Sequence, residues 1–186
     1  MAVKIVEKKL QDPSKDAVNI YKKEIILQKK LEDNPYILDI YEYFEDEERI
    51  YSIMQYCKGG DLLTDINKRI HNHERYTEKQ IQYIMFQLVK GVNYLAQNKV
   101  IHRDIKPENV LFVNGPPGRG NGLLKITDFG TAVRLRNPDE RLSDFYGTTH
   151  YMAPEKVGKN YSFSSDIWSV GVIYYLMLHK RLPYEG

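Results

Sequence analysis

Apolar residues follow a strand-like pattern in the first part of the chain. Short β-rich runs predict three strands there: 2–6, 37–44 and 49–56. A helix is predicted over 16–31, because Ile20, Leu27 and Leu31 recur at helical spacing. The polar stretch 7–15 is predicted to be a loop before that helix.

After the glycine pair in 58–60, the apolar spacing becomes helical. Leu62, Leu63, Ile66 and Ile70 form one stripe and predict a short helix. Thr77 is predicted to cap a longer helix that runs to about Gln97, with Gln80 completing a capping box. Three more elements are predicted further on: strands over 110–113 and 123–127, paired as a hairpin, and a helix over 164–178. The order of strands and helices predicts an α+β fold class, with 58–60 as the boundary between two lobes.

Composition narrows the class of protein. The chain has 186 residues, 42% of them hydrophobic and 28% charged, as in a soluble globular protein. A net charge of +2 gives no reason to expect nucleic-acid binding. The single cysteine, Cys57, excludes a disulfide framework and favours a reducing compartment, so a cytoplasmic location is expected, with the nucleus also compatible. The most apolar run, 167–178, is shorter than the ~20 residues that a membrane span needs, so no span is expected.

Two short stretches hold the groups that phosphoryl transfer requires. The stretch 102–109 contains a carboxylate, a cation and an amide, and 128–130 adds an Asp-Phe-Gly. Transfer needs a carboxylate to orient the attacking hydroxyl, a cation to offset phosphoryl charge, and oxygen ligands for Mg²⁺. In this order, with Ala-Pro-Glu at 153–155, the motifs resemble those of the eukaryotic protein kinase family, serine/threonine type.

The resemblance implies a two-lobed protein-kinase-like fold. Its small lobe would be residues 1–57 and its large, mainly helical lobe 58–186. No Gly-x-Gly-x-x-Gly precedes Lys4, and the last helices of the large lobe would follow Gly186, so the kinase domain is expected to be truncated at both ends. Motif details look most like those of the calcium/calmodulin-dependent and calcium-dependent protein kinases.

For catalysis, the resemblance implies a role for each charged motif residue. Asp104 would be the base for the substrate hydroxyl, and Lys106 would neutralise the moving phosphoryl group. Asn109 and Asp128 would bind Mg²⁺. Thr148, in the Gly-Thr before the Ala-Pro-Glu motif, would bond to the catalytic aspartate and lysine.

Lys4 lies in a strand similar to the family's Val-Ala-Ile-Lys strand. The resemblance implies that Lys4 binds the α- and β-phosphates of ATP and pairs with Glu24. The alternative for Glu24 is a solvated helix face. Gln28 stands one turn later, where relatives have an apolar residue directed towards Phe129 and His102, and a buried polar group there is expected to loosen the active arrangement.

The adenine site is expected around the connection between the lobes. By resemblance, Met54 would be the gatekeeper residue, the backbone of Gln55 and Cys57 would read the base, and Ala2 and Leu111 would sandwich it. Two more carboxylates are implied to meet the ribose or a basic substrate side chain, or to act as simple helix caps: Asp61 and Glu108. Protein substrates with basic residues N-terminal to the target are therefore expected.

The stretch 128–155 resembles an activation segment. Asp144 stands four residues before Thr148, where many relatives carry an activating phosphothreonine, and we expect Arg103 to pair with it. The hypothesis is that this loop needs no phosphorylation there. Asp166 matches a family carboxylate that braces the backbone of the catalytic loop.

The sequence thus predicts an ATP-dependent protein serine/threonine kinase that uses Mg²⁺. Two alternatives stay open, a pseudokinase that acts as a binding scaffold and an inactive fragment. The intact set of Lys4, Asp104, Asn109 and Asp128 argues against a pseudokinase, because pseudokinases typically lose one of these residues.

Overall fold

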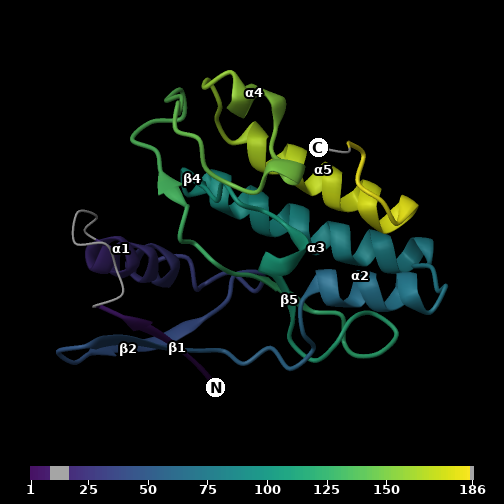
Figure 1. The fold of residues 1–186 in the computed structure, drawn as a ribbon, viewed down its shortest axis with the longest axis horizontal. Helices are drawn as coiled ribbons and strands as arrows, with labels where there is room; N and C mark the ends of the chain where they lie inside the picture. The colour runs from purple at the N-terminus through teal and green to yellow at the C-terminus, as the bar shows by residue number, and fades with distance from the viewer. Residues whose placement is uncertain (9–16, 185–186) are drawn as a thin grey trace.

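The structure is a computed structural model that describes residues 1–8 and 17–184 (Figure 1). The helices and strands follow in this order: β1 (Ala2–Glu7), α1 (Ala17–Lys29), β2 (Ile40–Glu45), β3 (Arg49–Met54), α2 (Leu62–His71), α3 (Glu78–Gln97), β4 (Val100–Ile101), the 3-10 turn η1 (Pro107–Asn109), β5 (Val110–Phe112), β6 (Leu124–Ile126), β7 (Val133–Arg134), the 3-10 turn η2 (Thr149–Tyr151), α4 (Pro154–Val157) and α5 (Ser164–His179). The predicted α+β class is confirmed. Asp16, the predicted start of the first helix, and residues 9–15 of the predicted loop lie outside the described residues.

Three of the predicted strands form one antiparallel sheet in the order β1-β3-β2. Ala2 is paired with Met54 at one end of the β1–β3 ladder, and Glu7 with Arg49 at the other. The acidic turn between β2 and β3 is closed by Asp46, whose carboxylate accepts the N–H groups of Glu48 and Arg49. Helix α1 lies against this sheet (Figure 1), and together they enclose a small core of Tyr21, Ile25, Ile40 and Ile50.

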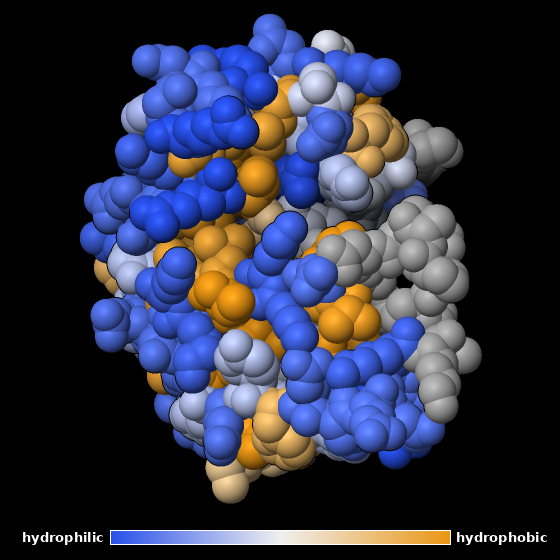
Figure 2. All heavy atoms as spheres, turned by 90° about the vertical axis from the view of Figure 1, so that its left-hand side faces the viewer, coloured by the Kyte–Doolittle hydropathy of each residue, from blue (hydrophilic) through white to orange (hydrophobic). Residues whose placement is uncertain are grey.

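The apolar stripe predicted for α1 was partly wrong. Ile20 is 51% exposed and Leu27 is half-buried, whereas Tyr21 and Ile25 face the sheet. The Tyr21 hydroxyl is 2.8 Å from the Ser52 hydroxyl on β3, so the helix is rotated to bring this tyrosine inward. Figure 2 shows hydrophobic atoms within a mostly hydrophilic face on this side of the molecule.

The helical part is built around α3, which lies between α2 and α5 (Figure 1). The predicted capping box at its start is present, with Thr77 and Gln80 each bonding the other's backbone. One large hydrophobic cluster joins these helices to β5 and β6. On α2 the predicted stripe was wrong at Ile70, which is 36% exposed, because the buried Arg69 occupies that face and pairs with a carboxylate one turn earlier.

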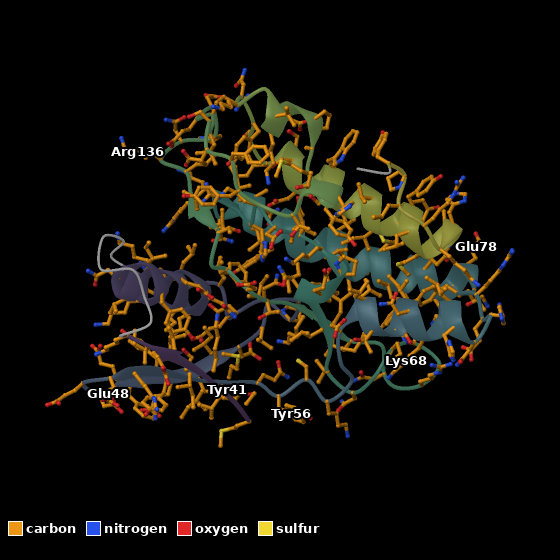
Figure 3. The ribbon with its side chains drawn as sticks, in the orientation of Figure 1. Tyr41, Glu48, Tyr56, Lys68, Glu78 and Arg136 are labelled. Carbon is orange, nitrogen blue, oxygen red and sulfur yellow. The ribbon has the colours of Figure 1, made fainter. Side chains whose placement is uncertain are left out.

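Short strands fill the space between the sheet and the helices. The predicted hairpin is confirmed as β5 paired with β6. A second pair, β4 with β7, was not predicted, because two residues are too few to show a period. Figure 1 shows β5 between the sheet and the helices, and Figure 3 shows Glu48 and Arg136 at the periphery. The segments of the catalytic motifs therefore occupy the middle of the molecule.

Candidate active site

The catalytic stretch begins where β4 ends, and Asp166 of α5 holds its backbone. The two carboxylate oxygens of Asp166 accept the N–H of His102 at 2.7 Å and the N–H of Arg103 at 2.9 Å. Arg103 has a φ of 71°, a left-handed conformation that is costly for a residue with a side chain. Asp166 lies more than sixty residues away in sequence from both of these N–H groups. Its two hydrogen bonds fix the path of the loop backbone, which is the bracing contact that the sequence predicted for Asp166.

Asp104, just after this bend, is surrounded by hydrogen-bond donors. Its Oδ1 accepts the N–H of Thr148 at 2.9 Å and the Thr148 hydroxyl at 2.8 Å. Its Oδ2 lies 2.9 Å from Lys106 Nζ and 3.4 Å from the Asn109 amide nitrogen. Burial alone would raise the pKa of Asp104, but Lys106 and Thr148 hold that pKa below its ordinary value. The carboxylate is thus kept ionised and in a fixed orientation.

Lys106 connects the two other groups of this cluster. Its ammonium donates to the Thr148 hydroxyl at 3.0 Å, so Lys106, Thr148 and Asp104 are mutually bonded. Burial opposes the charge, but hydrogen bonding to Asp104 and its negative charge raise the pKa of Lys106. The negative charges of Glu108, which is exposed in η1, and of Asp128 also raise the pKa of Lys106.

Asn109 and Asp128 are the two residues expected to bind a cation. The buried Asn109 amide nitrogen donates to the Asp104 carbonyl at 2.9 Å, which leaves its Oδ1 as the free acceptor. Asp128 is exposed, with a φ of 65°. Two oxygen donors of this kind suit Mg²⁺, which keeps most of its waters and takes one or two protein carboxylates or amides. Among the described residues, no group of three or more His, Cys, Asp or Glu side chains is arranged to hold a metal.

The predicted pair between β1 and α1 is present. Lys4 Nζ lies 3.2 Å from Glu24 Oε1, with the Lys4 side chain 45% exposed and that of Glu24 11% exposed. Burial would lower the pKa of Lys4, but Glu24, Tyr21 and Asp128 raise it. Burial raises the pKa of Glu24, and Lys4 only partly offsets that effect. A Cβ on Gly130 would be 3.3 Å from Asp128 and 3.4 Å from Glu24, so the Asp-Phe-Gly stretch lies beside this pair.

The polar residue noted in α1 is accommodated. Gln28 is buried, and its amide donates to the Leu38 carbonyl at 2.8 Å. The expected loosening therefore does not apply, because the buried amide has a hydrogen-bond partner. His102 and Phe129, the residues towards which this position was expected to point, pack edge to face with their ring centres 4.9 Å apart. Burial lowers the pKa of His102, and its ring donates a hydrogen bond to the Thr127 carbonyl.

The residues expected around adenine lie on three segments. Ala2 pairs with Met54 across β1 and β3, and both are half-buried. Gln55 donates its N–H to the Asp39 carbonyl, and the Cys57 carbonyl accepts the Gly60 N–H. Tyr56 between them is 61% exposed, at the lower edge of the molecule in Figure 3.

The end of the lobe connection is tied to β5. Gly59 donates to the Phe112 carbonyl, and Phe112 donates back to Gly60. A Cβ on Gly59 would lie 2.6 Å from that carbonyl, so only glycine allows the approach. The backbone of Asp61 forms an isolated antiparallel β-bridge with Leu111. The carboxylate of Asp61 caps α2 by accepting the Thr64 N–H at 2.7 Å. Of the two readings left open for Asp61, the structure thus contains the helix cap.

The activation segment meets the catalytic loop at Arg103. Arg103 Nη1 lies 3.5 Å from Asp144 Oδ2, and its guanidinium lies 4.5 Å from the centre of the Tyr146 ring. Its Nε also donates to the Thr131 carbonyl. The expected Arg103–Asp144 pair is therefore present, with the Asp144 side chain 60% exposed.

Comparison with known protein families agrees with this geometry. The family model described as "Protein kinase domain" matches residues 1–186. The chain belongs to the protein kinase domain family. As curated relatives of this kinase domain, CDPK-related kinase 3 of Arabidopsis thaliana is 37% identical over 99% of the chain, and Calcium-dependent protein kinase 3 of Plasmodium yoelii yoelii is 37% identical over 100%. The Calcium/calmodulin-dependent serine/threonine-protein kinase 1 of Oryza sativa subsp. japonica is 34% identical over 99%.

The match covers only part of each relative. The chain spans 30%, 32% and 29% of the lengths of these three proteins, respectively. The expected likeness to calcium-dependent kinases is confirmed by the names and identities of these relatives. Across residues 1–8 and 17–184, no helix has both the length and the apolar character needed to cross a membrane.

Two buried lysines near the site of this kinase domain were not singled out from the sequence. Lys125 on β6 lies 3.0 Å from the Asp39 carboxylate and donates to the Ile37 carbonyl. Lys156 on α4 is 2% exposed and donates to the Arg103 carbonyl. Their partners are 88 and 53 residues away in sequence, so no local pattern signals their burial.

Proposed function

We propose that this kinase domain transfers the γ-phosphoryl group of ATP to a serine or threonine hydroxyl of a protein, with Asp104 as the base. The observation that carries the proposal is the carboxylate of Asp104, which Lys106 and Thr148 hold in one orientation. Kinase catalysis depends mainly on positioning and on offsetting charge, and this cluster supplies both.

In the proposed reaction, each group of the cluster has one task. Asp104 orients the substrate hydroxyl and accepts its proton as the phosphoryl group moves. Lys106, next to it, offsets the negative charge on the transferred group. Thr148 keeps Asp104 in place and brings the activation segment close to the substrate.

The nucleotide and its metal fit the residues around this cluster. The Oδ1 of Asn109 and the carboxylate of Asp128 would hold Mg²⁺, which neutralises phosphate charge when bound. Lys4, supported by Glu24, would contact the α- and β-phosphates. These roles are supported by the shared neighbourhood of Lys4, Glu24 and Asp128 described above.

The adenine and ribose sites are proposed on either side of the lobe connection, which divides residues 1–57 from 58–186. Ala2 and Leu111 would cover the two faces of the base, beside Met54, while the backbone of Gln55 and Cys57 would read its edge. These assignments rest on the similarity of the chain to the family. Both carboxylate oxygens of Asp61 already accept from Thr64, so a ribose hydroxyl would bond to their remaining lone pairs or displace the cap.

The proposed substrates are proteins with a basic residue N-terminal to the target. Glu108 supports this preference, because its carboxylate is exposed and lies near Lys106 and Tyr151 at the catalytic loop. Asp61 supports it less, since its carboxylate caps a helix. The cytoplasmic location expected from the single cysteine stays a prediction.

The test is a peptide phosphorylation assay on the full-length protein with ATP and Mg²⁺. Asp104→Asn is expected to lower kcat by ~10³-fold, because the base is lost while the shape of the side chain is kept. Asp139→Asn, at an exposed aspartate of the activation segment, is the matched control and should keep wild-type activity. Equal activity of wild type and Asp104→Asn would refute the assignment of the base.

The same assay separates an enzyme from a scaffold. A scaffold would bind ATP in a direct binding measurement, yet show no transfer to any peptide in the full-length protein. The ion pair of Lys4 and the fixed carboxylate of Asp104 favour the enzyme.

A further inference from the structure

Lys156 is a buried cation with no role in the scheme above. It lies on α4, directly after the Ala-Pro-Glu motif, and is 2% exposed. Lysine is almost never fully buried without a partner, because its ammonium loses hydration. Burial lowers the pKa of Lys156, with Asp166, Asp104 and Glu155 opposing that effect and Arg103 adding to it.

Two backbone carbonyls accept hydrogen bonds from this ammonium. Lys156 Nζ donates to the Arg103 carbonyl at 2.6 Å and to the Tyr146 carbonyl at 3.2 Å. The ring of Tyr161 lies 5.3 Å away and provides a further favourable contact for a cation. None of the ion pairs found among residues 1–8 and 17–184 includes Lys156, so its partners are dipoles and a ring.

The first of these carbonyls belongs to the peptide that leads into Asp104. Because a peptide unit is planar, holding the Arg103 carbonyl also fixes the direction in which the Asp104 backbone starts. The N–H of Arg103 is held from the other side by the carboxylate of Asp166 at 2.9 Å. Arg103, with its strained φ of 71°, is therefore held by a negative group at one end and a positive group at the other.

The second carbonyl leads into Gly147 and Thr148. A Cβ on Gly147 would lie 2.5 Å from the Arg103 carbonyl and 3.3 Å from Lys156 Nζ, so the two backbones are in close contact here. The φ of Gly147 is 118°, which a residue with a side chain rarely adopts. Lys156 thus joins the two backbones at the point where Thr148 reaches Asp104.

We propose that Lys156 is a positioning residue, which ties the segment carrying Thr148 to the catalytic loop and so keeps Asp104 oriented for transfer. This inference rests on the proposed function of Asp104. An apolar side chain of the same length would fill the space without the cost of burying a charge. The hydrogen bonds that the Lys156 ammonium donates to the Arg103 and Tyr146 carbonyls explain why a charged side chain is buried at this position.

The test uses Lys156→Met in the full-length protein, with Lys159→Met as the control. Methionine is similarly long and unbranched, so it fills the space, but it leaves the Arg103 and Tyr146 carbonyls without their donor. A modest fall in melting temperature is expected, while kcat falls by ~10- to 100-fold. The KM for ATP is expected to be unchanged, because Lys156 does not touch the proposed nucleotide site. Lys159 is exposed on the same segment, and its variant should behave as wild type.

A second variant and a double-mutant cycle separate positioning from general stability. Lys156→Arg keeps the charge and should retain more of kcat than Lys156→Met. In a Thr148→Ala background, Lys156→Met should cost much less in kcat than in wild type, because the proposed effect of Lys156 on Asp104 acts through the position of Thr148. Wild-type kcat in Lys156→Met, a lower kcat in Lys156→Arg than in Lys156→Met, or additive effects with Thr148→Ala would each overturn the inference.

The outcome for Asp104 is read separately. If Asp104→Asn loses activity and Lys156→Met does not, only the inference about Lys156 fails. If Asp104→Asn keeps wild-type activity, the proposed function itself fails, whatever Lys156→Met shows.

Discussion

Two carboxylates of this molecule have nearly the same burial but opposite electrostatics. The side chain of Asp104 is 12% exposed and that of Glu24 is 11% exposed, and each lies within 3.2 Å of a lysine ammonium. Yet the pKa of Asp104 is lowered and that of Glu24 is raised. Burial raises the pKa of both carboxylates, so the lowered pKa of Asp104 comes from its partners, Lys106 and Thr148.

The number and rigidity of the donors explain the contrast. Asp104 accepts from the backbone and hydroxyl of Thr148, in addition to Lys106 and Asn109. Glu24 faces one lysine that is itself 45% exposed. The orientation of the Asp104 carboxylate is therefore set by the fold, whereas the Lys4–Glu24 pair depends on how α1 lies against β1.

The strongest way to break this contrast is to remove the lysine beside Asp104. Lys106→Met is expected to lower kcat by ~10³-fold, because the variant loses the cation that offsets phosphoryl charge and holds Asp104. Steady-state phosphorylation kinetics of the full-length protein measure it. Lys68→Met, at an exposed lysine of α2 labelled in Figure 3, is the control, and equal kcat values for the two variants would contradict the role of Lys106.

The corresponding change at the other carboxylate should affect activity more than stability. Lys4→Met is expected to lower kcat/KM by ~10²-fold. The free energy of unfolding should change by less than about 1 kcal/mol, because Lys4 is partly exposed in its contacts with Glu24 and the Tyr21 ring. Denaturant unfolding and kinetics check both, with Lys30→Met as an exposed control on the chain after α1. A large loss of stability with normal kinetics would show that Lys4 is structural.

Local signals in the sequence were sufficient for much of this fold. The capping box of Thr77 and Gln80 spans four residues, and the α3 stripe and the β5–β6 hairpin follow from short-range patterns. The site residues were assigned through motif resemblance, and the structure contains the predicted contacts of Thr148 with Asp104 and Lys106.

What could not be predicted depends on distant partners. The buried face of α1 was wrong because the orientation of Tyr21 is decided by Ser52, thirty-one residues later. Arg69 is an exception, because the partners that allow its burial are close in sequence, Asp65 one turn earlier and the ring of Tyr76. Lys156 reads as an ordinary polar residue until the carbonyls that it bonds are brought together by folding.

The opposite pKa shifts predict opposite dependences of stability on pH. Asp104 has a lowered pKa when folded, so its contribution is present above its ordinary value of 3.8 and is lost as the pH falls through the folded value. Glu24 has a raised pKa when folded, so its contribution is present below its ordinary value of 4.5 and is lost as the pH rises through the folded value.

Urea unfolding at a series of pH values around these pKa values, for wild type and two variants, measures how stability depends on pH. The stability of wild type relative to Asp104→Asn should increase with pH, and its stability relative to Glu24→Gln should decrease. Slopes of the same sign would show that the two carboxylates do not differ as described.

The smallest expected effect is at the activation segment. Asp144→Ala is expected to lower kcat by ~2- to 5-fold, because the contact with Arg103 is 3.5 Å long and Asp144 is largely exposed, as is typical of weak ion pairs. Peptide phosphorylation rates of unphosphorylated full-length protein give the result, with Asp139→Asn as control. Undiminished activity in Asp144→Ala would refute the hypothesis that Asp144 replaces a phosphorylated residue.

The most direct test of the central claim is a crystal structure of the full-length protein with Mg²⁺ and a non-hydrolysable ATP analogue. The account predicts that the metal contacts Asn109 Oδ1 and Asp128, and that Asp104 faces the terminal phosphate with Thr148 and Lys106 still bonded to it. A nucleotide bound elsewhere, or a metal that touches neither Asn109 nor Asp128, would contradict it.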